Sequence, residues 1–322
     1  MQAIAEAHPN IALVKYWGKR DGPDNVPATP SLSITLSQLR TRTRVRVEDP
    51  GNRDRIVMLN GNVVRDAKIE ACLDRLTARA GDAVGLRIDT DNNFPTAAGL
   101  ASSASGFAAL VTAMNAALGL RLSEFDRSME ARRASASAAR SLYGGFVTLS
   151  GGDDAATWIA RPELDAGAWP LAVVVAICSE QPKAVSSGAG MLRSKSSPFY
   201  TRWTETAATD FTDARAALAA RDFDRLGAIA EANCLAMHAV MLSARPALSY
   251  WTPATVACMA RVRELRAAGE GVFFTIDAGP QVKAVCEPAA AERVRAALAQ
   301  VPGVQDVVAV GLGGPAAIVA DS

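Results

Sequence analysis

Small and hydroxyl-bearing side chains gather in one stretch of the chain, residues 92–106, immediately before a helical pattern. From Phe107 onward the apolar residues recur at i, i+3, i+4 and i+7, the spacing of one helix face. A helix N-terminus leaves backbone N–H groups unpaired and carries a partial positive charge, so it attracts anions. Ser102, Ser103 and Ser105 would add hydroxyl donors. The stretch predicts a phosphate-binding loop, although a tightly packed helix start without a ligand has the same composition.

Two charged residues stand beside apolar runs of strand length. Lys15 follows the run 11–14, and its neighbours alone favour an edge-strand lysine that reaches water. Asp277 follows the run 272–276 and precedes a Gly-Pro turn, a context that by itself fits a carboxylate capping a turn. The neighbouring residues alone therefore do not decide whether Lys15 and Asp277 have a structural or a functional role.

Composition and charge narrow the class of protein. The chain has 322 residues, 49% of them hydrophobic, which suits one large domain or two ordinary ones. The formal net charge of +1 gives no support to nucleic acid or an anionic membrane as a partner. The longest apolar run, 171–178, has the length of a strand, so no membrane span is predicted. The first residues do not resemble a signal peptide, and we expect a cytoplasmic protein.

Cysteine and histidine are few and scattered. The five cysteines include no C-x-x-C pair, so we expect reduced core residues. The two histidines, His8 and His238, nearly exclude a multi-histidine metal site, and no acidic metal motif is apparent. A lone histidine on a helix is more often structural than a ligand, and we expect this of His238. We therefore predict no metal-ligating residue.

The secondary-structure signals change character between the two halves. Hairpins and helices interleave in the first half, whereas a buried strand, a Ser-, Gly- and Lys-rich loop at 181–198 and long helices open the second. The second half has the element order of a split βαβ, ferredoxin-like layer. The expected strands are 31–36, 45–47, 84–89, 171–178, 272–276, 307–310 and 317–319, with a hairpin turn at Asn60-Gly61. The expected helices are 66–79, 107–118, 123–133, 208–220 and 289–299, with others beginning at Asp222 and Thr252.

Four segments, in their order along the chain, carry a resemblance to a known family. They are 10–21, containing Lys-Tyr-Trp-Gly-Lys-Arg-Asp; 92–106, containing Pro-Thr-Ala-Ala-Gly-Leu-Ala-Ser-Ser-Ala; 138–146; and 274–280, containing Asp-Ala-Gly-Pro. Together they resemble the diphosphomevalonate decarboxylase family of the GHMP kinase superfamily. The first two strings are specific to this family, and the likeness covers nearly the whole chain.

The resemblance implies an α+β protein with the GHMP kinase fold. Residues 1–168 would form a domain like ribosomal protein S5 domain 2, with the phosphate-binding loop 92–106, and residues 169–322 a ferredoxin-like domain. ATP, accompanied by Mg²⁺, and the substrate would meet in the cleft between the domains. Family members phosphorylate the 3-hydroxyl of mevalonate 5-diphosphate, then release phosphate and carbon dioxide to give isopentenyl diphosphate. Relatives are often homodimers, so we expect a homodimer.

The resemblance also implies three catalytic residues. Asp277 matches the family's catalytic aspartate, a carboxylate that would orient the tertiary hydroxyl or take its proton. Lys15 matches the lysine beside it, which would keep the carboxylate anionic and neutralise charge at the reacting oxygen. Arg140 matches the arginine that grips the substrate carboxylate, a task suited to a planar fork of N–H donors.

Further residues match the family's binding positions. The diphosphate tail would be held by Tyr16, Lys19, Ser135 and Ser137, next to Arg140. The nucleotide would contact a longer set: Asn93, Pro95, Gly99, Ala101, Ser102, Ser103, Ala104, Ser105 and Ser187. Without an acidic motif, Mg²⁺ would be held mainly by phosphates and water.

Two departures from the family pattern concern the phosphate tail. The chain has Thr29-Pro30-Ser31 where many members have Asn-Ser-Ser, and Ala134 and Ala136 where they have glycine. The added methyl groups lie beside the expected diphosphate and disfavour positive φ. Alternative functions are therefore a phosphomevalonate decarboxylase acting on the 5-monophosphate, a mevalonate 3-kinase that does not decarboxylate and, more remotely, a nucleotide-binding pseudoenzyme.

Overall fold

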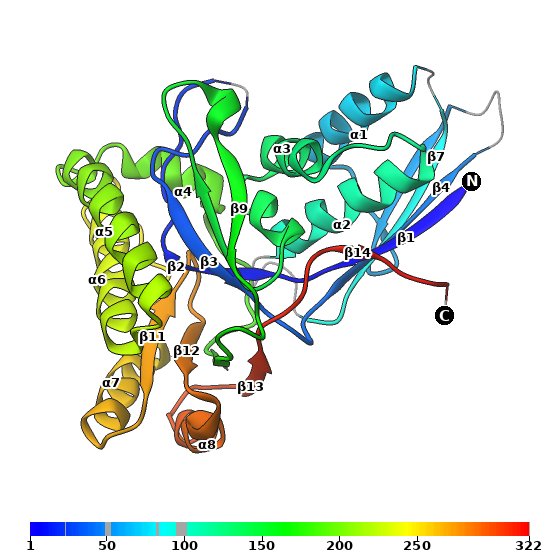
Figure 1. The fold of residues 1–322 in the computed structure, drawn as a ribbon. Helices are drawn as coiled ribbons and strands as arrows, with labels where there is room; N and C mark the ends of the chain where they lie inside the picture. The colour runs from blue at the N-terminus through cyan, green and yellow to red at the C-terminus, as the bar shows by residue number, and fades with distance from the viewer. Residues whose placement is uncertain (23, 49–52, 82–83, 95–101, 322) are drawn as a thin grey trace.

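The computed structural model describes residues 1–22, 24–48, 53–81, 84–94 and 102–321. Helices and three mostly antiparallel sheets make up this part of the chain (Figure 1). The mixture agrees with the predicted α+β class. No helix in these ranges is long and apolar enough to cross a membrane.

The first sheet has six strands and carries helices on one face. Its order is β14 (Ala317–Ile318), β1 (Gln2–Ala7), β4 (Thr41–Val47), β7 (Leu86–Asn92), β5 (Arg55–Leu59) and β6 (Asn62–Val63). Helices α1 (Ala67–Ala80), α2 (Ser102–Ala117) and α3 (Glu124–Ala134) share an apolar core with it. Because β14 pairs with β1, the last described strand of the chain joins a sheet built mainly from its first third.

The second sheet contains the strand that leads into the segment Lys-Tyr-Trp-Gly-Lys-Arg-Asp. Its order is β2 (Asn10–Val14), β3 (Ser31–Thr35), β8 (Phe146–Ser150) and β9 (Ile159–Leu164). The small-residue run after α3 forms the short 3-10 helix η1 (Ala136–Leu142), which contacts β2, β3, β8 and β9, and η2 (Ala155–Thr157) precedes β9. All five residues of β2 are buried, so the strand delivers Lys15 into the interior.

The third sheet has the predicted ferredoxin-like order. Its strands run β11 (Val272–Ile276), β12 (Val282–Cys286), β10 (Ala172–Ile177) and β13 (Asp306–Gly311), all antiparallel. Helices α7 (Pro253–Ala267) and α8 (Ala291–Ala299), the latter preceded by η3 (Pro288–Ala290), pack with it in one apolar cluster. This is the split βαβ topology expected from the sequence.

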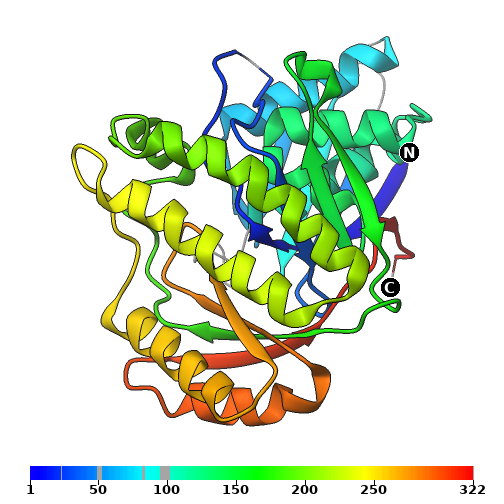
Figure 2. The same cartoon turned by 60° about the vertical axis from the view of Figure 1, so that its left-hand side comes forward.

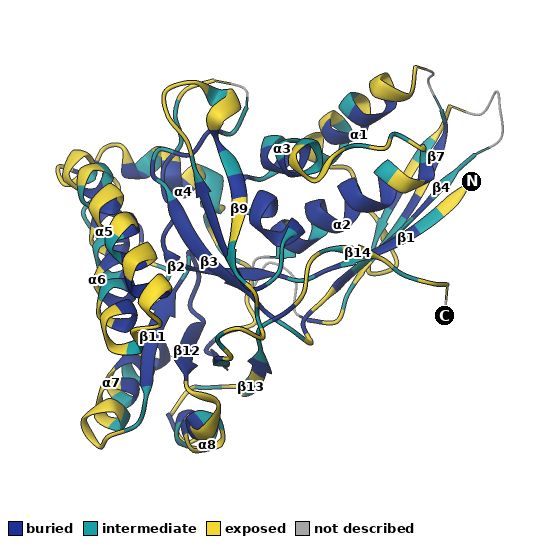
Figure 3. Ribbon diagram, viewed as in Figure 1, coloured by how far each residue is buried: buried dark blue, intermediate teal, exposed yellow. Residues whose placement is uncertain are grey.

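A helical pair joins the second and third sheets. Helices α5 (Tyr200–Ala220) and α6 (Phe223–Leu242) run side by side, and α6 contacts both β2 and β11 (Figure 2). One apolar core includes Ile11 of β2, Val173 of β10 and Phe273 of β11, and the faces that the helices turn toward the sheets are the buried ones (Figure 3). The core that orients β2 against β11 is therefore common to both halves of the chain.

Several local predictions are confirmed. Asn60 and Gly61 both have positive φ between β5 and β6, as a two-residue hairpin turn of the predicted type requires. Helix α1 begins after the Asp66 cap, whose carboxylate accepts backbone N–H bonds. Helix α7 begins at Pro253 with a capping box on Thr252.

Other local predictions are wrong. The stretch 181–198, expected as a loop, contains helix α4 (Ser187–Ser194), capped by Ser186. Helix α5 begins at Tyr200, well before residue 208, because the buried Trp203 and Ala207 anchor its first turns. The strand expected at 84–89 is β7, which runs further, to Asn92.

The turn between η1 and β8 passes close to another backbone segment. Gly145 has φ +68° and donates its N–H to the Gly313 carbonyl at 2.9 Å. A Cβ atom on Gly145 would lie 2.7 Å from the backbone nitrogen of Ala166. Only glycine fits here, since both the φ value and the space exclude a side chain.

We predict that Gly145→Ala lowers the free energy of unfolding by about 2 kcal/mol or more, because it combines an unfavourable φ with a backbone clash. Urea unfolding followed by circular dichroism measures the change. The matched control is Gly314→Ala, where an added Cβ meets nothing within 4 Å. Equal stability of the two variants would contradict the steric argument.

Candidate active site

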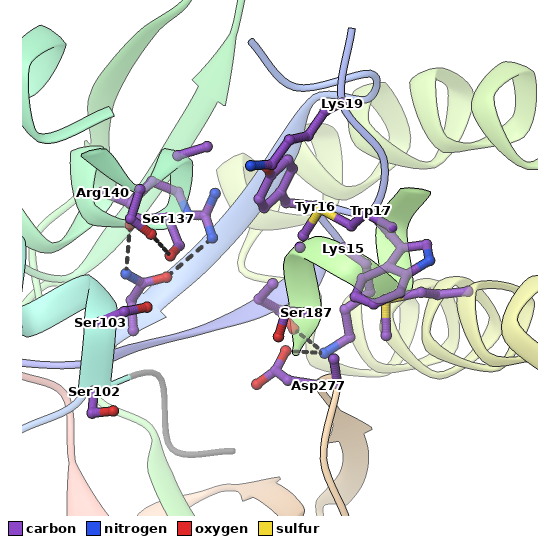
Figure 4. A pocket seen from close by; sticks show the side chains of 18 of the residues that line it. Lys15, Tyr16, Trp17, Lys19, Ser102, Ser103, Ser137, Arg140, Ser187 and Asp277 are labelled. Carbon is purple, nitrogen blue, oxygen red and sulfur yellow. Dashed lines mark hydrogen bonds and ion pairs between the residues drawn. The ribbon is translucent and has the colours of Figure 1, made fainter. Parts of the chain in front are cut away.

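One cleft gathers residues from both halves of the chain. Its walls come from the end of β2, the starts of α1, α2 and α4, helix η1 and the turn after β11. The space inside it, open to solvent, is about 1030 Å³. In Figure 4, Arg140 and Ser137 lie on one side of this space and Lys15, Ser187 and Asp277 on the other. The lining residues relevant to chemistry are Asn10, Lys15, Tyr16, Lys19, Lys68, Ser102, Ser103, Ser135, Ser137, Arg140, Lys183, Ser187 and Asp277.

Lys15 and Asp277 form an ion pair across the two halves. Lys15 Nζ lies 2.7 Å from Asp277 Oδ1 and also donates to the Ala12 carbonyl at 2.8 Å. The Lys15 side chain is 1% exposed, so the interpretation of this lysine as one that reaches water is wrong. Local sequence could not reveal this, because the partner strand β11 lies more than 250 residues away.

The Asp277 carboxylate contacts lysines and is not used to cap its own turn, as the local sequence suggested. Its second oxygen, Oδ2, lies 3.3 Å from the Nζ of Lys283. Burial opposes ionisation of this carboxyl group, but attraction by Lys15 and Lys283 outweighs it and holds the pKa of Asp277 well below its usual range. The side chain is 24% exposed, so a charged carboxylate stays within reach of a ligand.

Arg140 is buried in η1 and largely held by neighbouring side chains. Its Nε donates to Ser33 Oγ at 2.9 Å, Nη1 to Ser31 Oγ at 2.7 Å and Nη2 to Asn10 Oδ1 at 3.1 Å. Burial lowers the pKa of Arg140 to about 10, so the group remains cationic at neutral pH. A guanidinium has five N–H donors, and these contacts leave one on each terminal nitrogen. Two such donors can bind both oxygens of a carboxylate.

The residues predicted to hold the phosphate tail lie together in the cleft. Tyr16 Oη is buried and has no hydrogen-bond partner among the described residues. Ser135 Oγ and Ser137 Oγ lie 3.2 Å apart, and Lys19 Nζ donates to Asn25 Oδ1 at 2.5 Å. Burial, together with the nearby charge of Lys68, lowers the pKa of Lys19. These hydroxyl and ammonium donors suit a phosphate group, and Ala134 and Ala136 lie beside them as expected.

The residues predicted to contact the nucleotide are only partly brought together. Ser102 and Ser103 begin α2 and line both the cleft and a second cavity of about 740 Å³, whose walls include Val57, Ile69 and Phe107. Ser187, at the start of α4, lines the cleft only.

The remaining predicted nucleotide residues lie elsewhere or cannot be placed. Ala104 and Ser105 are buried in α2 and line neither cavity. The Ser105 hydroxyl lies inside the domain, where its Oγ is 2.7 Å from Thr41 Oγ1. The Asn93 side chain bonds the backbone of Gln38 and Arg40 and also lines neither cavity. Pro95, Gly99 and Ala101 lie outside the described residues.

Sequence reasoning missed two lysines that line the cleft. Lys68 is the second residue of α1. Lys183 precedes α4 and donates to Ser187 Oγ and to the Ala278 carbonyl, both at 3.0 Å. Burial lowers the pKa of Lys183. The signal for Lys183 was its place in a Ser-, Gly- and Lys-rich stretch, whereas nothing in the local pattern distinguished Lys68 from an exposed helix residue.

The charge of the lining is strongly unbalanced. Five cationic side chains face one carboxylate, Asp277, and the cations are Lys15, Lys19, Lys68, Lys183 and Arg140. Such a cationic cleft favours ligands that bring several negative charges. The arrangement suits phosphorylated substrates. Among the described lining residues, Asp277 is the charged group that can accept a hydrogen bond from a ligand hydroxyl.

His238 lies in α6 outside the cleft lining. Its ring packs against Trp251 in a tilted arrangement with a centroid distance of 4.7 Å, and Nε2 lies 3.3 Å from the Ile276 carbonyl. Burial lowers the pKa of His238 to about 3, so the imidazole is neutral at physiological pH. Its position supports the structural role that we expect from a lone helix histidine.

Comparisons with known proteins agree on one family across nearly the whole chain. Residues 7–160 match the model of the diphosphomevalonate decarboxylase-like N-terminal domain, and residues 173–310 match that of the mevalonate 5-diphosphate decarboxylase C-terminal domain. The chain is 36% identical to a diphosphomevalonate decarboxylase of Ganoderma lucidum, over 87% of this chain and 76% of the relative. It is 32% identical to a phosphomevalonate decarboxylase of Haloferax volcanii, over 100% of this chain and 99% of the relative.

The fold of the chain is also similar to that of solved structures. One of them, described as MDDEF in complex with MVAPP, AMPPCP and magnesium, superimposes with a TM-score of 0.92 at 38% sequence identity, over 99% of both chains. The predicted GHMP kinase fold is thereby confirmed. The matching domain models, the sequence identity and the shared fold show that the chain belongs to the diphosphomevalonate decarboxylase family.

Proposed function

We propose that the protein converts mevalonate 5-diphosphate and ATP into isopentenyl diphosphate, ADP, phosphate and carbon dioxide. One observation carries the proposal: a single cleft holds a charged carboxylate, Asp277, opposite an arginine, Arg140, with two N–H donors left over. The first group suits the 3-hydroxyl of the substrate, and the second suits its carboxylate.

In the phosphorylation step, the 3-hydroxyl oxygen attacks the γ-phosphorus of ATP. The new O–P bond forms as the bond to the β,γ-bridging oxygen breaks, and ADP leaves. Asp277 accepts the hydrogen bond of the hydroxyl, orients its oxygen and takes its proton as the O–P bond forms. Lys15 and Lys183 lie in the same part of the cleft and neutralise charge on the transferring group.

In the decarboxylation step, the new 3-phosphate and the carboxylate leave from neighbouring carbons. The electrons of the C1–C2 bond form the C2–C3 double bond, while the C3–O bond breaks and phosphate departs. Arg140 binds both carboxylate oxygens and aligns the C1–C2 bond with the leaving group. Its own contacts to Ser31, Ser33 and Asn10 keep the fork rigid during this step.

The phosphate tail and the adenine ring have separate places in this proposal. Tyr16, Lys19, Ser135 and Ser137 bind the diphosphate, and the number of donors there favours two phosphates over one. The apolar second cavity takes the adenine, since it meets the cleft at Ser102 and Ser103, where the ATP phosphates would lie at the start of α2.

Mg²⁺ accompanies ATP in this proposal and neutralises charge on its phosphates. The described residues contain no group of three or more metal-binding side chains, and the one lining carboxylate is already paired with lysines. The cleft therefore fits a cation held by phosphates and water. From the family resemblance we also propose a homodimer, whose mass light scattering of the purified protein would test. The cytoplasmic location proposed for it rests on the first residues, which do not resemble a signal peptide.

We predict that the purified protein with Mg-ATP releases ADP and carbon dioxide in equal amounts from mevalonate 5-diphosphate. Release only with mevalonate 5-phosphate would support the function of the Haloferax volcanii relative. ADP without carbon dioxide would indicate a 3-kinase, and no ADP at all would indicate a nucleotide-binding pseudoenzyme.

We predict that Asp277→Asn lowers kcat by on the order of 10²–10⁴, because the amide cannot replace a charged acceptor of the hydroxyl proton. The Kd of nucleotide should change only a few-fold, since the adenine cavity is untouched. Stopped assays give kcat, and calorimetry gives Kd. Turnover near that of the unmodified protein would remove Asp277 from the reaction.

We predict that Arg140→Lys lowers carbon dioxide release by about 100-fold, because an ammonium group cannot reproduce the two-donor fork and shifts the carboxylate. A matched control is Arg132→Lys, which changes another buried arginine that does not line the cleft. Near-normal release by the Arg140 variant would refute the carboxylate role.

A further inference from the structure

Lys283 occupies an unusual place in the third sheet. It lies in the interior strand β12, where it pairs with Thr275 of β11 and Val175 of β10. The same sheet face carries Val285 and Phe273, which belong to the apolar core shared by both halves. Lys283 is nevertheless fully buried, with a side chain 0% exposed. An ammonium group thus projects from an otherwise apolar part of a sheet face.

Burying a charge in this way has a large desolvation cost unless the charge is paired. The acidic partner is Asp277, whose Oδ2 lies 3.3 Å from Lys283 Nζ. This oxygen is itself buried and makes no hydrogen bond among the described residues, and it forms an ion pair with Lys283. Oδ1, which accepts from Lys15, is then the oxygen available to a ligand.

The two lysines contact different oxygens of the carboxylate, Lys15 Oδ1 and Lys283 Oδ2. Lys15 lines the cleft, whereas Lys283 does not. Lys15 can therefore touch substrate, whereas Lys283 reaches the site through its ion pair with Asp277. A pair of one lysine and one aspartate would have no net charge, and the second lysine makes the cluster +1.

We propose that Lys283 is a positioning residue for phosphoryl transfer: it holds Oδ2 from the buried side, so that Asp277 stays charged and aimed while Lys15 binds the transferring phosphoryl group. The inference rests on the proposed function. Without Lys283, engagement of Lys15 by a phosphoryl oxygen would leave the carboxylate without a close cation in a buried place. Its proton affinity would then rise just when a charged acceptor is required.

Other titratable groups also face this cluster. They are Lys183 before α4, Arg140 in η1, and Cys234 and His238 in α6. Lys183 and Arg140 are cations and keep part of the effect when Lys283 is removed, whereas the buried His238 is neutral. The shift caused by losing Lys283 is therefore partial, and its direction is fixed: the pKa of Asp277 rises.

The test uses Lys283→Met, which keeps the length of the side chain without its charge, in the full chain. We expect kcat to fall about 10- to 100-fold with both KM values within about threefold, since Lys283 does not line the cleft. We also expect the acidic limb of the kcat profile to move to higher pH, because Asp277 protonates more readily. In the Asp277→Asn background, the same change should add little further loss.

Two further variants separate charge from packing. Lys283→Gln retains a hydrogen-bond donor without the charge, so it should show the same shift of the acidic limb to higher pH. It replaces Lys283→Met in the test if that variant fails to fold. Val285→Ala, on the same strand and face, should lower Tm while leaving the pH profile in place.

The outcomes distinguish the inference from the proposed function. Normal kcat and an unmoved acidic limb in a folded Lys283 variant would overturn the positioning role, even if the unmodified protein is an active decarboxylase. So would a pH shift of equal size in Val285→Ala. Absence of carbon dioxide release by the unmodified protein would instead refute the proposed function.

Discussion

The site depends on the buried ion pair between Lys15 and Asp277. The lysine follows β2, in the sheet formed by the first half of the chain, and the aspartate follows β11, in the sheet of the second half. Such a pair contributes favourably only when its geometry is held closely, because both charges lose contact with water. The helix α6 and the core shared by both halves supply this rigidity, since they pack against β2 and β11 together. The ion pair thus requires the second and third sheets to keep a fixed position relative to one another.

In the rest of the cleft, the lysine and arginine side chains outnumber the carboxylates that could neutralise them. Its lysines and Arg140 are spread over several elements, and Asp277 is the single acid among the lining residues that the structure describes. Self-repulsion among these cations costs stability in the absence of ligand, and a phosphorylated ligand removes that cost when it binds. The same excess explains how one cleft can hold a diphosphate, the ATP phosphates and a carboxylate. Repulsion among the lining cations thus destabilises the folded protein locally, while the same cations are already placed to stabilise negative charge at the reacting atoms.

Periodicity and helix caps predict the ferredoxin-like layer and most helices, because these signals are local, whereas the fold class is predicted through the family resemblance. It predicts Asp277, Lys15 and Arg140 only through family resemblance; the local pattern alone misassigns Lys15 as exposed. Burial of that lysine is decided by a strand more than 250 residues away, which no local pattern contains. Lys283 was missed for the same reason, although a lysine inside the apolar stretch 282–286 is a signal that could have singled it out. Helix α4 is not predicted by the local sequence, because its eight residues span only about two turns and include Gly188 and Gly190, which favour loops.

The most direct test of this account is a crystal structure of the protein with mevalonate 5-diphosphate, Mg²⁺ and a non-hydrolysable ATP analogue. The account predicts the 3-hydroxyl within hydrogen-bond distance of Asp277 Oδ1, the substrate carboxylate on the two terminal nitrogens of Arg140, and Lys283 still against Asp277 Oδ2. A substrate carboxylate bound away from Arg140, or a 3-hydroxyl turned away from Asp277, would contradict it.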